Sequence, residues 1–71
     1  MSKQVNQERY VPEEVAGLAM DLRREWGKIA ETARPLKAHE QHNKRMIEGA
    51  LNGLIRSWPA LDPIVGDAVR P

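Results

Sequence analysis

Residues 15–33 read VAGLAMDLRREWGKIAETA, and this stretch decides the fold. Its apolar residues recur at spacings of three and four, which places them along one face of an α-helix. They are Val15, Leu18, Ala19, Leu22, Trp26, Ile29, Ala30 and Ala33. Charged residues occupy the opposite face. Such a helix is stable in water only when another element covers its apolar stripe.

A second stripe with the same spacing follows Pro35. It consists of Leu36, His39, Asn43, Met46, Ile47, Ala50, Leu51, Leu54, Ile55 and Trp58. Pro35 disfavours helical geometry at Arg34, so the first helix must end just before it. The pattern therefore predicts an antiparallel hairpin over residues 12–58, with helices at about 12–33 and 36–58 and a very short link.

The two ends of the chain lie outside this hairpin. Pro59 ends the second helix, and Asp62 with Pro63 is a typical helix start. A short helix within 59–71 is expected to fold back on the hairpin, followed by a tail. It would place Leu61, Ile64, Val65 and Ala68 on its inner face. Residues 1–11, MSKQVNQERYV, show no periodicity and predict a disordered N-terminal arm. The fold class is all-α.

Composition excludes several classes of protein. The 71 residues include no Cys and carry a net charge of +1. A disulfide framework and a thiolate metal site are therefore absent, and the charge is not that of a strongly basic nucleic-acid binder. No apolar run approaches the roughly 18 residues of a membrane span, and we expect neither membrane insertion nor a secretory signal peptide.

Catalytic chemistry has little material in this sequence. Ser2 and Ser57 lack a nucleophile motif, and no Gly-rich phosphate loop is present. We expect no enzyme activity, no cofactor and no small-molecule substrate. His39 and His42 share a helix face, but no third metal ligand has a suitable spacing, so they are interpreted as solvent-facing rather than metal-binding.

Two further spacings predict contacts along the second helix. Glu40 and Lys44 predict an i,i+4 ion pair. Gly49 and Gly53 form a Gly-x-x-x-Gly pattern, which we interpret as close packing inside the hairpin rather than as the seam of a dimer.

Positive charge concentrates around the predicted bend. The cations there are Arg34, Lys37, Lys44 and Arg45, with His39 and His42 between them, and Glu40 is the only acidic residue in this stretch. One interpretation is a solvated helix face; the other is a surface that docks on an acidic protein or on a nucleic-acid backbone.

The chain as a whole resembles a family of small phage-encoded transcription regulators, known from a Xanthomonas phage, that bind and inhibit host bacterial RNA polymerase. The runs MSKQVNQERYVPEEV, RREWGK and SWPALDPIVG carry this resemblance. It implies a non-enzymatic protein in the host bacterial cytoplasm. It also implies contacts with the β′ N-terminus and the β flap near the RNA exit channel, inhibition of initiation by displacement of the σ factor, and antitermination.

The resemblance provides no motif that identifies contact residues. From exposure and chemistry we expect partner contacts by Val5, Arg9 and Tyr10 of the arm and by Arg34, Lys37, Lys44 and Arg45 of the bend, with possible contact to the emerging RNA. The free protein is expected to be a monomer. Two alternatives remain open: a small helical nucleic-acid-binding protein, and a homodimeric four-helix interaction module.

Overall fold

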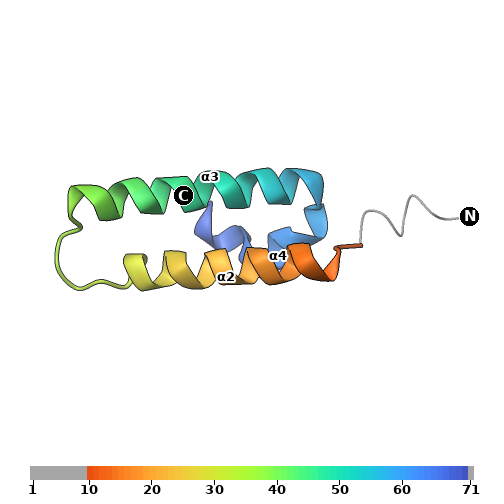
Figure 1. Ribbon diagram of the computed structural model, residues 1–71, viewed down its shortest axis with the longest axis horizontal. Helices are drawn as coiled ribbons and strands as arrows, with labels where there is room; N and C mark the ends of the chain where they lie inside the picture. Colours follow the sequence, from red (N-terminus) through yellow and green to blue (C-terminus); the bar gives the residue numbers. More distant parts are fainter. Residues whose placement is uncertain (1–9, 71) are drawn as a thin grey trace, which may run out of the picture.

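The computed structural model describes residues 10–70. The arm predicted for residues 1–11 therefore falls almost wholly outside the described residues, as do Val5 and Arg9. Every regular element in the described part is helical, and the chain forms an antiparallel hairpin of α2 (Glu13–Ala30) and α3 (Ala38–Ser57) (Figure 1). A short C-terminal helix, α4 (Asp62–Val65), follows. The predicted all-α fold is confirmed.

Helix α2 ends three residues before the predicted end at 33. It begins directly after Pro12, with Glu13 and Glu14 in its first turn, where the helix dipole favours carboxylates. At the other end, the Thr32 N–H donates to the Ile29 carbonyl at 3.2 Å, and the Thr32 hydroxyl donates to the Lys28 carbonyl at 3.1 Å. These local bonds tighten the last turn and satisfy carbonyls that a longer helix would have used.

The link between the helices is longer than predicted. Residues 31–37 separate α2 from α3, so Leu36 and Lys37, predicted to begin the second helix, lie in the loop with Pro35. Helix α3 begins at Ala38 because the Lys37 N–H donates to Glu40 Oε1 at 2.8 Å, which satisfies one of the unpaired donors at the helix start. The same carboxylate receives the Arg34 guanidinium. The predicted Glu40–Lys44 ion pair is wrong, because Glu40 pairs with Arg34 of the loop and Lys44 pairs with Glu48.

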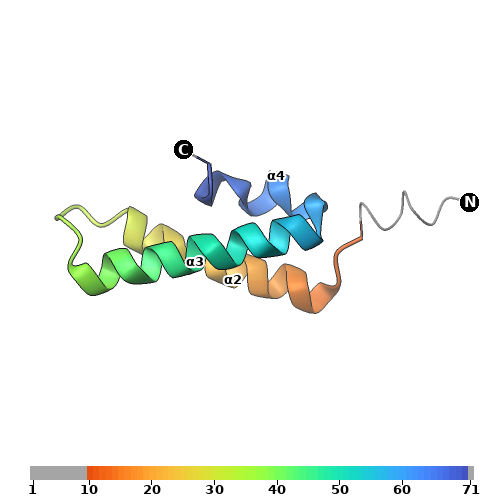
Figure 2. The same cartoon turned by 90° about the horizontal axis from the view of Figure 1, so that it is seen from above.

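The segment after α3 is irregular and packs against both helices of the hairpin. It consists of a 3₁₀ turn, η1 (Pro59–Leu61), then α4, then a second 3₁₀ turn, η2 (Gly66–Ala68). Figure 2 shows it on one side of the hairpin. Its buried side chains form the core with residues of α2 and α3; the fully or almost fully buried set is Ala19, Leu51, Leu61, Val65 and Ala68.

Ile64 is the exception to the predicted inner face of this segment. Ile64 is 54% exposed, whereas Leu61, Val65 and Ala68 are buried as expected. A 3₁₀ turn advances about 120° per residue and an α-helix about 100°. In a continuous α-helix Ile64 would lie on the same face as Leu61, Val65 and Ala68. Because 3₁₀ and α-helical turns alternate in this segment, the buried face rotates and Ile64 lies outside it.

Ion pairs hold the C-terminal segment in place. Arg23 of α2 donates to both carboxylate oxygens of Asp67 at 3.0 and 2.7 Å, and Arg70 donates to Asp62 at 2.7 Å. Gly66 is buried beside the Asp62–Arg70 pair, and a Cβ there would overlap Asp62 Oδ1. A residue larger than glycine at this position would displace the carboxylate that binds Arg70.

Candidate partner-binding surface

Trp26 and Glu48 join the two long helices through a polar contact. The indole Nε1 donates to Glu48 Oε2 at 2.8 Å, and Lys44 Nζ donates to the same oxygen at 2.7 Å. The Arg23 guanidinium and the Lys44 ammonium lie 4.9 and 5.5 Å from the centre of the Trp26 ring. The bonds from Lys44 and then from Trp26 hold the pKa of Glu48 below its usual value. Lys44 is therefore paired within the fold.

The loop contains a second strong pair. Arg34 donates to both oxygens of Glu40 at 2.8 and 2.6 Å, and its guanidinium also donates to the Pro35 carbonyl. The Arg34 bonds, followed by the Lys37 backbone N–H, lower the pKa of Glu40 to about 2. The pair compensates the charge of Arg34, so two of the four cations predicted to form a basic bend, Arg34 and Lys44, are paired with carboxylates of the same chain.

Three predicted contact residues within the described range remain available: Tyr10, Lys37 and Arg45. Tyr10 is 61% exposed, and Lys37 and Arg45 are exposed. Neither cation forms an ion pair with any residue between 10 and 70. The structure thus separates the predicted basic group into two cations that form ion pairs, Arg34 and Lys44, and two that form none within the described residues, Lys37 and Arg45.

Arg56 is a surface cation that the sequence analysis missed. It is exposed and, like Lys37 and Arg45, has no ion-pair partner in the described part of the chain. Positions 45, 49, 52 and 56 are three or four apart, so they share one face of α3. We define the basic face of α3 as Arg45, Gly49, Asn52 and Arg56. The spacing of Arg45 and Arg56 along the helix was visible in the sequence. The sequence analysis nevertheless grouped Arg45 with the cations nearest to it along the chain and left Arg56 out.

The glycines and histidines of α3 also face outward. Gly49 and Gly53 are exposed, and a Cβ at either position would have no neighbour within 4 Å. The prediction that they pack inside the hairpin is wrong, because the core side of α3 is formed by Leu51 and its neighbours. His39 and His42 are exposed. Within residues 10–70, no three side chains of the metal-binding types gather at one place.

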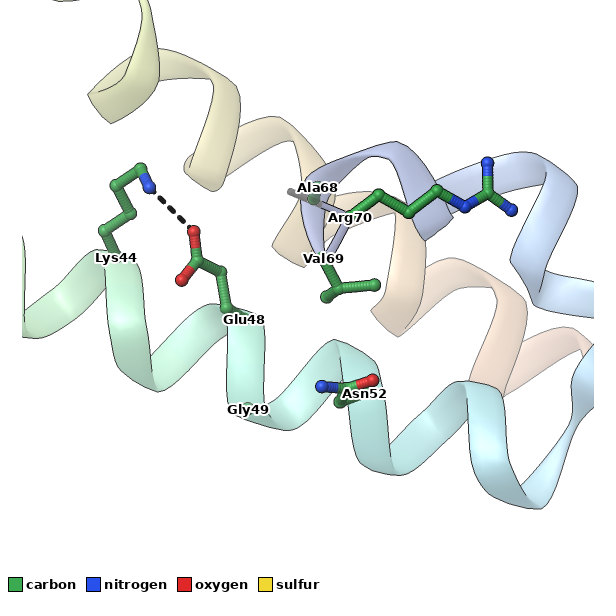
Figure 3. Close-up of a pocket in the computed structure, with 7 residues that line it drawn as sticks. All are labelled: Lys44, Glu48, Gly49, Asn52, Ala68, Val69 and Arg70. Carbon is green, nitrogen blue, oxygen red and sulfur yellow. Dashed lines mark hydrogen bonds and ion pairs between the residues drawn. The ribbon is translucent and has the colours of Figure 1, made fainter.

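A groove of about 410 Å³ runs between α3 and the C-terminal segment. It is lined by Lys44, Glu48, Gly49, Asn52, Ala68, Val69 and Arg70. Figure 3 shows Val69 reaching from the C-terminal segment toward α3, with Asn52 below it and Glu48 turned toward Lys44. A second hollow, of about 230 Å³, lies farther toward the loop and is lined by Leu36, Gln41, Lys44, Arg45 and Glu48.

Comparison with known proteins identifies no relative. No model of a protein family matches the chain, no curated protein matches it in sequence, and no solved structure matches its fold. In the part of the chain that the structure describes, no helix has both the length and the apolar character needed to cross a membrane.

Proposed function

We propose that the protein is a non-enzymatic phage regulator that binds host bacterial RNA polymerase. The proposal joins the resemblance in sequence to one observation in the structure. The cations that lack an ion-pair partner in residues 10–70 all belong to α3 or to the residue before it: Lys37, Arg45 and Arg56. The other cations between residues 10 and 70 each pair with a carboxylate of the same chain.

This distribution of charge supports docking on an acidic protein surface. Cations that are not compensated by their own fold attract a complementary partner and raise the rate of association. General nucleic-acid binding is less well supported, because it requires many phosphate contacts and a more basic surface. Tyr10 adds an exposed aromatic side chain at the start of α2, a residue type enriched at protein interfaces.

The mechanism is occupation of a surface rather than chemistry. The protein would act in the host bacterial cytoplasm, as a monomer when free. It would contact the β′ N-terminus and the β flap near the RNA exit channel, displace the σ factor and so inhibit initiation. Bound to elongating polymerase beside the emerging RNA, the same protein would act as an antiterminator.

Charge reversal on α3 provides the test. Arg45→Glu with Arg56→Glu should weaken binding to purified bacterial polymerase by about tenfold at low salt, because each charge at the rim of an interface contributes roughly 0.2–1 kcal/mol and reversal adds repulsion. The matched control is Arg24→Glu with Lys28→Glu. These cations lie on α2, already pair with Asp21 and Glu25, and change the net charge equally.

Promoter-dependent transcription and readthrough of a terminator are the functional measurements. Wild type and the α2 control should inhibit initiation and promote readthrough, and the α3 variant should do both less well at equal concentration. If saturating wild-type protein leaves initiation and termination unchanged and forms no polymerase complex, the regulator proposal is wrong. Binding of nucleic acid alone would then favour the first alternative, and self-association the second.

A further inference from the structure

We infer that the 410 Å³ groove between α3 and the C-terminal segment binds a short, extended, acidic polypeptide segment. The inference goes beyond the proposed function, because it concerns the chemistry of the groove and holds whichever protein supplies the segment. It rests on the shape of the groove, on the hydrogen-bonding groups that line it and on its charge.

The floor of the groove allows close approach. Gly49 contributes no side chain, and a Cβ built there would have no neighbour within 4 Å. From Lys44 to Asn52, α3 advances about 12 Å at 1.5 Å per residue. Four extended residues, at about 3.3 Å each, cover this length. A volume of about 410 Å³ lies at the small end of the range for ligand sites, which suits a few residues rather than a docked helix.

The groups along the groove suit a polypeptide backbone. Asn52 is exposed, and its side chain forms no hydrogen bond with other groups in residues 10–70, so its amide can both donate and accept. A peptide unit offers the matching carbonyl and N–H, whereas a phosphodiester offers acceptors alone. Val69 provides an apolar wall, and no aromatic side chain lines the groove for base stacking. These features favour a peptide over RNA.

The charge of the groove selects an acidic segment. Its lining holds two cations, and each pairs with a carboxylate: Lys44 with Glu48, which also lines the groove, and Arg70 with Asp62. Lys44 uses one of its three N–H groups on Glu48, and Arg70 uses one of its five on Asp62, so both retain donors. Arg45, unpaired within the described residues, lines the adjoining hollow. A carboxylate near each end of the segment would meet Arg70 at one end and Lys44 with Arg45 at the other.

Trp26 supplies a reporter for binding, because its indole shares the Glu48 oxygen with Lys44. In a Trp58→Phe background Trp26 is the single tryptophan, and its fluorescence should change saturably on addition of the acetylated, amidated peptide Glu-Ala-Gly-Ala-Glu. The peptide with Gln in place of both Glu residues should bind at least tenfold more weakly. A five-nucleotide oligouridylate should also bind at least tenfold more weakly.

Two glycine substitutions form a matched pair. Gly49→Leu fills the groove and should weaken peptide binding at least tenfold, whereas Gly53→Leu, also at an open position of α3 but outside the groove, should change it less than twofold. Circular dichroism should show both variants folded. The inference is overturned if millimolar peptide has no effect, if the Gln peptide binds equally well, if Gly49→Leu binds like Gly53→Leu, or if the oligouridylate binds more tightly. None of these results depends on polymerase, so the proposed function would stand or fall separately.

Discussion

Leu51→Ala tests whether the core of this small domain is correctly placed. Leu51 is fully buried and packs with Ala19 of α2 and with Leu61 and Val65 of the C-terminal segment. Truncation removes three carbon atoms from the point where all three parts of the fold meet. A buried Leu→Ala change costs about 2–5 kcal/mol. A domain of this size has roughly 4–10 kcal/mol in total, so the variant should lose a large share of its stability.

Thermal and urea unfolding followed by circular dichroism measure this loss. At roughly 4–8 °C per kcal/mol for a domain of this size, we expect the midpoint to fall by at least about 8 °C. Leu18→Ala is the control, since it is the same substitution in the neighbouring helix at a side chain that is 51% exposed. Both changes have the same effect on helix propensity, so their difference reports burial. Equal losses of stability in the two variants would refute the placement of the core.

Two further substitutions test the polar contacts by unfolding measurements. The pKa of Glu40 is lowered to about 2 by Arg34, so its ionised form stabilises the fold above the ordinary value of 4.5 and this contribution is lost as pH falls toward 2. Glu40→Gln should therefore flatten the acid limb of a plot of unfolding free energy against pH, and an unchanged limb would contradict the pair. Trp26→Phe removes the indole donor to Glu48 and should cost about 1 kcal/mol more than Trp58→Phe, measured by urea unfolding; equal costs would show that the bond contributes nothing.

Local order was predictable wherever neighbouring residues determine the backbone. The stripes of α2 and α3 arise from residues three and four apart, and Pro12 and Pro59 mark helix boundaries through their own covalent geometry. The link was harder to predict. Its length depends on where Thr32 and Glu40 place their hydrogen bonds, and those bonds compete with simple continuation of the helices.

The candidate surface was predictable only in part, because the ion pairs that form in the fold decide which cations remain without a partner. Sequence proximity grouped Arg34 and Lys44 with Lys37 and Arg45, but a folded chain pairs charges by distance in space. Arg34 in the loop reaches forward to Glu40 in the first turn of α3. Lys44 pairs one turn along α3 with Glu48, which also accepts a hydrogen bond from Trp26 of α2.

The sequence by itself determined that the protein is an all-α hairpin, because periodicity and proline act over a few residues. Only the tertiary structure decided which charges remain for a partner and where a groove opens. Asp67, for example, reaches Arg23 across 44 positions of the chain, and Gly49 lines a groove only because the C-terminal segment folds back beside it. Contacts of this kind depend on how whole elements pack, so the spacing of residues along a single helix does not predict them.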